Sequence, residues 1–290
     1  MAAVTAAAAL LFFALAPTPL HAQTATGSIV GTVTDTSGNV IVGATVTVTD
    51  VATNQTRVTK TDSAGAYTVT FLKPATYDIS IESQGFQTFQ QNGIILNVDA
   101  ALTVDAKLPV GTVTQKVTVS GQPPLVEAQT SSIGQVLNTK TILDLPVNGR
   151  NSYAFAALVP GVIPSAGFSQ TAVDEYNDQF ISINGARPNQ SAFLLDGGVN
   201  TEPALSGPGF YPSIDLVQQY KVQTNNFSAQ FHSTSGGIIN VITKSGSNRF
   251  HGDVYEFLRN NYFDARDFFL NRTTQPTPPY RFNQFGGTIG

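Results

Sequence analysis

The chain has 290 residues, 41% of them hydrophobic and only 12% charged, about half the charged fraction of an ordinary soluble domain. Its formal net charge is −4 and no basic cluster offers phosphate contacts, so nucleic acid is excluded as a partner. Cysteine is absent, which excludes disulfide frameworks, thiolate zinc sites and CxxC redox centres.

Residues 1–22 are predicted to form a signal peptide. A largely apolar run of 11 residues extends from Ala6 to Ala16 and is followed at once by two prolines. A membrane helix needs roughly 20 apolar residues, so this run has the length of a signal-peptide core instead. Residues 20–22 fit a cleavage site, and the mature chain is expected to start at Gln23 and to leave the cytoplasm.

Residues 26–109 predict a β-sandwich of about seven short strands in two sheets. Apolar residues alternate with polar ones, which turns one face of each strand inward and the other toward water. The breaks carry Gly, Asn, Ser and Pro, which are turn residues. The residues expected to point inward are Val46, Val48, Tyr67, Val69, Phe71, Tyr77, Ile79, Ile81, Leu102, Val104, Ala106 and Leu108.

Residues 110–125 predict an extended linker. Its first part, TVTQKVTVS, is rich in Val and Thr, and a Gly and a Pro-Pro pair end it. Residues 126–246 then mix helix and strand signals and predict an α+β domain. Asn151 is placed to cap a short helix, and Ser213 to cap a second helix over residues 214–220. Strands are expected over residues 180–184, 191–196 and 237–244.

Residues 247–290 are rich in aromatic side chains and alternate loosely. Tyr255 and Phe257 alternate with Val254, Glu256 and Leu258. Aromatic girdles and alternating strands of about ten residues are typical of transmembrane barrels. No apolar stretch beyond Gln23 approaches the length of a membrane helix, so insertion in a membrane would require a closed barrel.

Two groups of motifs resemble known families. GSIVGTVTDTSGNVIVGATVTVTD and TDSAGAYTVTFLKPATYDISIESQGF resemble the carboxypeptidase-regulatory-like (transthyretin-like) β-sandwich, although Ala75 stands where that family usually has Gly. The blocks LDLPVNGRNSYAFAALVPGV, ISINGARPNQSAFLLDGGVN, PSIDLVQQYKVQTNNFSAQF and SGGIINVITKSGSNRFHGDVYEFLRN resemble the plug of TonB-dependent receptors that carry such a sandwich. Together the motifs cover nearly all of residues 26–290.

This resemblance implies a barrel of about 22 strands in the outer-membrane lipid, with its lumen filled by a plug at residues 126–246. Residues 247–290 would begin the barrel, and the sandwich would lie in the periplasm. An extracellular substrate (an oligosaccharide, a peptide or an iron chelate) would bind outside and be imported. The periplasmic partner TonB would capture an extended segment, the TonB box, by strand addition and pull on it.

Val117-Thr118-Val119-Ser120 is the candidate TonB box, because strand addition needs an extended peptide with free backbone groups. The same Val/Thr alternation would serve the last strand of the sandwich or the first strand of the plug. The sequence leaves these interpretations open.

Catalytic motifs are missing from the sequence, so no enzyme activity and no cofactor are predicted. The histidines, His21, His232 and His251, are far apart, and no HxxE, HExxH, G-x-S-x-G or G-x-G-x-x-G motif occurs. Arg150 and Arg187 are expected to form buried structural pairs. Solvated turns or loops are expected for Asp35, Asp50, Asp62, Asp174, Glu175 and Asp178.

The 44 residues of 247–290 would supply two or three membrane strands of about 9–11 residues. An open sheet edge cannot lie in lipid, so the chain is interpreted as a fragment of a longer receptor. Two alternatives stay open. One is an exported β-modular adhesin or cell-surface binding protein without transport activity. The other keeps the barrel but gives it a signalling or secretion-support role.

Overall fold

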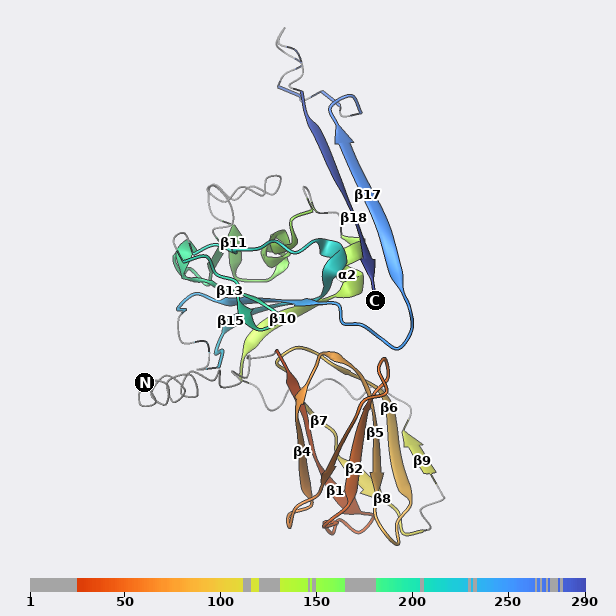
Figure 1. Cartoon of the computed structure of the whole chain (residues 1–290). Helices are drawn as coiled ribbons and strands as arrows, with labels where there is room; N and C mark the ends of the chain where they lie inside the picture. The colour runs from red at the N-terminus through yellow and green to blue at the C-terminus, as the bar shows by residue number, and fades with distance from the viewer. Residues whose placement is uncertain are drawn as a thin grey trace, which may run out of the picture.

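The chain is mostly β, as predicted, and Figure 1 shows a sandwich, a middle α+β region and a long hairpin in chain order. The predicted signal peptide, Ser120 and the acidic residues 174–178 lie outside the described residues. The computed structural model describes residues 25–111, 116–119, 131–145, 147, 150–164, 181–203, 206–228, 231, 234–263, 265–266, 268–269, 271, 276 and 279–290.

The first region consists of two facing β-sheets. One sheet has the order β3-β2-β5-β6-β9, and in the other β1 pairs with β4, β7 and β8. The strands are β1 (Gly27–Asp35), β2 (Thr45–Asp50), β3 (Thr56–Lys60), β4 (Ala66–Leu72), β5 (Ala75–Glu82), β6 (Thr88–Leu96), β7 (Ala101–Thr103), β8 (Ala106–Leu108) and β9 (Lys116–Val119).

The predicted period-two alternation builds the core between these sheets. Eleven of the twelve residues expected to point inward are buried, Phe71 being the exception. They form one cluster with Ile29, Val33, Leu72, Ile94 and Leu96. Apolar area removed from water stabilises such a core by roughly 25 cal/mol per Å².

Phe71 points outward because β4 contains a bulge. Gly27 of β1 pairs with Leu72 and Ile29 pairs with Val69. One residue separates the two positions in β1 and two residues separate them in β4, so β4 has one extra residue. Phe71 adopts a left-handed φ of 59° and its ring is 73% exposed, while Leu72 takes the inward position. An extra residue in one strand reverses the facing of those that follow.

Residues 102–108 form two strands, β7 and β8, where one was expected, so this region has eight strands before β9. Both pair in parallel with β1, and the ladder breaks at Val104. The Tyr67 hydroxyl donates to the Val104 carbonyl at 2.8 Å, and the Asp105 carboxylate accepts from the Thr32 amide at 2.8 Å. A Cβ on Gly31 would lie 1.9 Å from the Val104 carbonyl oxygen, so only glycine fits there.

The middle region is built on a five-stranded sheet of order β10-β15-β16-β13-β14, with β11 and β12 forming a separate pair. Its core joins aromatic and branched side chains, and Tyr153 meets Phe193 edge to face at 5.3 Å. The elements are β10 (Ile133–Asn138), α2 (Thr139–Asp144), η2 (Ser152–Leu158), β11 (Val162–Pro164), β12 (Ile181–Ile183), η3 (Pro188–Gln190), β13 (Ala192–Leu195), β14 (Gly198–Val199), η4 (Ile214–Leu216), β15 (Val217–Asn225) and β16 (Ile238–Thr243).

The predicted helix over residues 214–220 is wrong. Only the 3₁₀ turn η4 forms, Ser213 makes no side-chain capping bond, and β15 starts at Val217. β15 is hydrogen-bonded on both sides, to β10 and β16, so sheet pairing outweighs the local helix signal. By contrast, Asn151 does cap the short helix η2, which is 3₁₀ in type. The strands β12, β13 and β16 lie within their predicted ranges.

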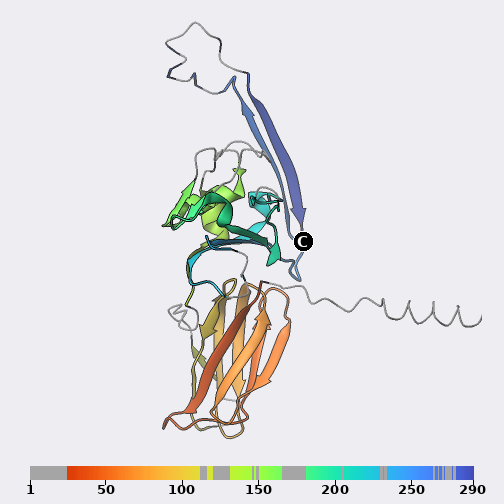
Figure 2. The same ribbon diagram turned by 90° about the vertical axis from the view of Figure 1, so that its left-hand side faces the viewer.

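The strands β17 (Gly252–Asn260) and β18 (Arg281–Ile289) pair along their whole length as a long antiparallel hairpin. Figures 1 and 2 show the hairpin beside the middle region, reaching past it on the side away from the sandwich. Tyr255 and Phe257 face the middle region, whereas Val254, Leu258 and Phe285 on the other side are largely exposed. Within the described residues, no helix has the length and hydropathy needed to span a membrane.

Candidate functional site

The candidate TonB box lies in strand β9, at the edge of the sandwich. β9 pairs in parallel with β6, with Phe89 opposite Val117, Gln90 opposite Thr118 and Gln91 opposite Val119. Ser120, the fourth residue of the candidate, lies outside the described residues. The segment is therefore extended and held through its backbone, as the interpretation of a last sandwich strand expects. Its binding to TonB stays a prediction.

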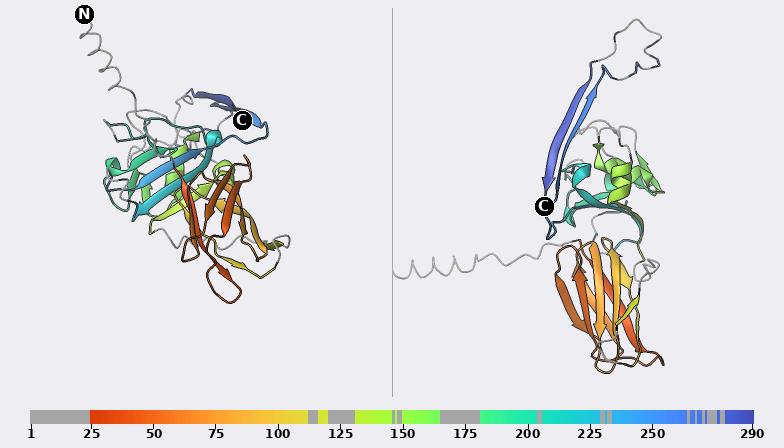
Figure 3. Two further views of the ribbon diagram at one scale, coloured as in Figure 1. Left: turned by 60° about the horizontal axis from the view of Figure 1, so that its bottom comes forward. Right: turned by 90° about the vertical axis from the view of Figure 1, so that its right-hand side faces the viewer.

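Lys221 forms the centre of a polar junction between the sandwich and the middle region. The views in Figures 1 and 3 place one end of the sandwich against this sheet. The residue is only 3% exposed, and its Nζ donates to the carbonyl oxygens of Val98 at 2.9 Å and Asp99 at 3.3 Å. A buried ammonium is costly unless it is paired, so the carbonyl oxygens of the turn between β6 and β7 help to offset the cost of burying Lys221.

Other polar residues extend this junction along the same face of β15. The Gln219 side chain accepts from the Val98 amide at 3.0 Å and donates to the Asn97 side chain at 3.1 Å. Gln223, two residues beyond Lys221, is also buried, whereas Val222 between them enters the apolar core. One face of β15 is thus apolar and the other is a buried polar row that the sandwich covers.

The Asp99 carboxyl is the titratable group of this junction. Asp99 occupies a left-handed turn position with φ 51°. Burial raises the pKa of its carboxyl above the ordinary value, and the nearby Lys221 ammonium offsets part of that rise. The negative charge is therefore less favourable here than in water, even beside a lysine.

Arg150 forms a second junction, between the middle region and the hairpin. Its Nη2 donates to Asp215 Oδ2 at 2.6 Å, and its guanidinium carbon lies 3.5 Å from the centre of the Phe257 ring. The Tyr255 hydroxyl donates to Ser213 Oγ at 3.1 Å, and Ser213 donates in turn to Asp215 at 3.0 Å. An ion pair, a stacked cation and a hydroxyl chain therefore hold β17.

The expectation of buried pairing is confirmed for Arg150 and wrong for Arg187. The side chain of Arg150 is 19% exposed and that of its partner Asp215 is 12% exposed. Arg187 is exposed, because it precedes Pro188 at the start of the surface turn η3. Arg150 adopts a left-handed φ of 53°, which directs it from the loop after α2 to the hairpin.

The aspartates of the sandwich bind their own turns. The carboxylates of Asp35, Asp50 and Asp62 accept backbone amides two to four residues further along, as solvated turn aspartates do. In the described part of the chain, no cluster of three or more His, Asp or Glu residues has the geometry for a metal ion.

Sequence reasoning did not identify the polar row on β15. Gln219, Lys221 and Gln223 alternate with Tyr220 and Val222, a period-two signal that the helix assignment concealed. The partners in the 97–99 turn are 120 or so residues away, so no local pattern could have shown the contact.

Two family models match the chain. Residues 28–109 match the carboxypeptidase regulatory-like domain, and residues 242–290 match an outer membrane beta barrel domain. The TonB-dependent transporter Oar of Myxococcus xanthus is 27% identical over 259 residues, which cover 87% of this chain and 23% of that transporter. The chain therefore spans about a quarter of that relative's length, and the similarity confirms the resemblance inferred from the motifs.

Two solved structures overlap the chain in part. The outer membrane transporter YddB from Escherichia coli is 18% identical, over 54% of this chain and 23% of that one, with a TM-score of 0.41. Wild-type catechol 1,2 dioxygenase of Acinetobacter radioresistens is 16% identical, over 35% of this chain and 57% of that one, with a TM-score of 0.25.

Proposed function

We propose, from the similarity of this chain to TonB-dependent receptors with an N-terminal carboxypeptidase-regulatory-like domain, that it belongs to an energised outer-membrane importer. In this proposal residues 1–22 are the signal peptide, residues 26–109 a periplasmic sandwich and residues 110–125 a linker. Residues 126–246 are the plug, and residues 247–290 begin the barrel. The chain has no enzymatic role in this scheme.

The similarity to a TonB-dependent transporter across 87% of the chain carries the proposal. The two faces of the hairpin support it. The outward side chains of Val254, Phe285 and Ile289 are 92%, 77% and 90% exposed, which suits contact with lipid. The opposite face contacts Arg150 and Ser213 of the middle region, as a barrel wall would contact a plug.

TonB binding is assigned in this proposal to residues 117–120. TonB-type capture requires strand addition, and β9 already takes part in one such pairing as an edge strand beside β6. Exchange of β6 for TonB would conserve the number of backbone hydrogen bonds. The substrate class is not part of the proposal.

Site-specific cross-linking tests the proposal. These 290 residues contain no cysteine, so Thr118→Cys, introduced into the full-length receptor after any cysteine outside them has been replaced by serine, places a single thiol in β9. We expect TonB to cross-link to it in cells, and to cross-link more when substrate is present. Thr56→Cys, at the opposite edge of the same sheet, is the matched control and should give no TonB adduct. Equal adducts at both sites, or uptake that persists without TonB, would contradict the importer.

Fractionation separates the importer from an adhesin. The full-length importer should stay with outer membranes after a carbonate wash, because a closed barrel is embedded in lipid. A β-modular adhesin held at the surface by polar contacts should be released into the supernatant.

A further inference from the structure

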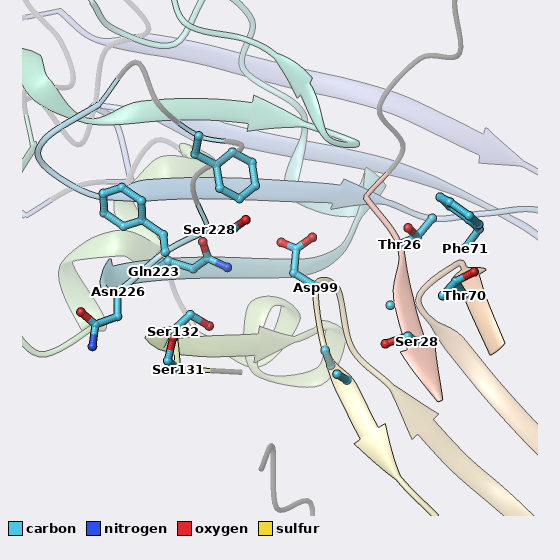
Figure 4. Close-up of a pocket in the computed structure, with 15 residues that line it drawn as sticks. Thr26, Ser28, Thr70, Phe71, Asp99, Ser131, Ser132, Gln223, Asn226 and Ser228 are labelled. Carbon is cyan, nitrogen blue, oxygen red and sulfur yellow. The ribbon is translucent and has the colours of Figure 1, made fainter. Parts of the chain in front are cut away.

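A cavity of about 560 Å³ lies where the sandwich meets the middle region (Figure 4). This volume is within the range of roughly 300–1,000 Å³ that small-molecule sites have. Three parts of the sandwich and two of the middle region contribute to its walls. They are the start of β1, the β4 bulge, the turn before β7, the start of β10 and the end of β15 with the residues that follow it.

The walls are polar and offer no positive charge. Hydroxyls come from both regions, including Ser28 and Thr70 of the sandwich and Ser131 of the middle region, and amides come from Gln223 and Asn226. Among the described residues that line the cavity, Asp99 is the only charged one and none is Lys or Arg. An anionic ligand would meet the Asp99 carboxylate and no cationic side chain in the lining, since Lys221 nearby is occupied by the turn carbonyls, so the chemistry favours a neutral ligand with many hydroxyls.

Gln223 presents a buried polar atom that lacks a partner. The residue is 4% exposed, and its Oε1 accepts no hydrogen bond from the described residues. A buried acceptor of this kind is unfavourable unless a donor reaches it. Gln223 lines the cavity (Figure 4), so a ligand hydroxyl placed there would supply that donor.

Phe71 places an aromatic face at the same cavity. Its left-handed φ of 59° is strained for an aromatic residue, and the bulge leaves the ring 73% exposed. Strained residues of this type are often retained at ligand contacts. Phe227 and Phe231 line the cavity from the middle region, so aromatic residues line it from both sides.

We propose that this cavity binds a neutral saccharide segment of two or three sugar units. The hydroxyls of the saccharide donate to Gln223 Oε1 and the Asp99 carboxylate, and the apolar face of one sugar ring stacks on Phe71. The proposal goes beyond the transport function, because the cavity lies between the sandwich and the middle region, away from the hairpin. The same chemistry has two sources, which are the cargo of an importer and a glycan resident in the periplasm.

Calorimetric titration of the full 290-residue chain with maltotriose and with triacetylchitotriose tests binding. We expect at least one of these neutral trisaccharides to bind with a Kd below about 1 mM, and a triuronic acid to bind at least tenfold more weakly. Absence of binding by both neutral probes up to 10 mM would overturn the proposal. The proposal would also be overturned if a neutral Val-Thr hexapeptide bound at these residues and neither saccharide did.

Phe71→Gly separates binding from folding. Glycine accepts a φ near 59° without strain, so this variant should keep or raise the melting temperature while it weakens saccharide binding at least tenfold. Gln223→Ala should weaken binding as well. Phe250→Gly, at a fully exposed phenylalanine outside the cavity, is the matched control and should bind as the parent does. Unchanged binding in Phe71→Gly would overturn the assignment.

Uptake by cells that carry the full-length receptor distinguishes the two sources. If the saccharide is cargo, Phe71→Gly should lower its uptake. If it is a resident glycan, uptake should be unchanged, while retention of the receptor on purified cell-wall glycan should fall. If neither uptake nor retention changes in Phe71→Gly, the result would count against a role of the cavity in cells. Cross-linking to TonB at Thr118→Cys should be unaffected, so failure here is distinguishable from failure of the importer.

Discussion

The middle region contacts each of its two neighbours through one cationic side chain, and the two cations are bound by different kinds of group. Toward the sandwich, Lys221 is 3% exposed and donates to two backbone carbonyls. Toward the hairpin, Arg150 is paired with Asp215, and its guanidinium carbon lies 3.5 Å from the centre of the Phe257 ring. An ammonium is a compact charge with three donors, whereas a guanidinium is a plane that suits stacking and carboxylates.

The difference shows what each junction requires. Carbonyls of a single turn hold Lys221, so that contact depends on the backbone shape of residues 97–99. Side chains of the hairpin hold Arg150, so that contact depends on which residues β17 turns inward. Loss of the cation should therefore cost more at the first junction, where buried backbone acceptors lose their donor.

Lys221→Met should have the largest effect. Removal of the ammonium takes the hydrogen-bond donor from the Val98 and Asp99 carbonyls and the nearby positive charge from the Asp99 carboxylate. This should lower the free energy of unfolding by about 3 kcal/mol. Urea denaturation followed by tyrosine fluorescence measures this. Lys60→Met, at an exposed position of β3, should change stability by less than about 0.5 kcal/mol. Equal effects of the two substitutions would mean that Lys221 does not hold the junction.

Arg150→Lys should rank second, with a loss of about 2 kcal/mol, because lysine keeps the charge but loses the planar stack on Phe257. The readout is protection of β17 amides in hydrogen exchange, which should fall while protection of β1 amides stays unchanged. Arg187→Lys, at an exposed turn, is the matched control. Retained β17 protection in Arg150→Lys would show that charge alone holds the hairpin.

Tyr255→Phe should rank third. It removes the hydroxyl that donates to Ser213 and should cost about 1 kcal/mol. A double-mutant cycle with Ser213→Ala gives the coupling between the two, which should be positive and similar in size. Additive effects would show that the hydroxyl chain to Asp215 contributes no stability.

Asp99→Asn should have the smallest effect, and it concerns pH. Because burial raises the pKa of Asp99 in the folded chain above the ordinary 3.8, its contribution is fully present below that value. The contribution is then lost as the pH rises through the raised pKa. The urea midpoint of the parent should decline over that window relative to Asp99→Asn. Parallel curves for the two proteins would contradict a raised pKa.

The sequence predicted the sandwich core well because alternation there is local. Val46 and Val48, or Ile79 and Ile81, are buried simply because strands turn alternate residues inward. Phe71 broke the rule because a bulge depends on the number of residues between two partner strands, which one strand cannot reveal.

The candidate sites were less predictable for a related reason. The stretch 117–119 is extended, as a strand that completes a sheet and a strand that awaits a partner both would be, so its Val/Thr alternation could not separate these roles. Arg150 was correctly expected to pair, but its contact with Phe257 joins residues more than a hundred positions apart. Pairings of that span follow from the assembled fold and not from any local pattern.

The polar face of β15 also bears on how the protein avoids aggregation during synthesis. N-terminal domains generally fold first, so the sandwich can close its core before β15 has emerged. Its docking turn then offers the Asn97 side chain, the Val98 amide and two backbone carbonyls, and the sheet offers Gln219, Lys221 and Gln223. These polar groups can stay hydrated on both surfaces until the two regions meet, which limits the apolar surface exposed at this junction beforehand.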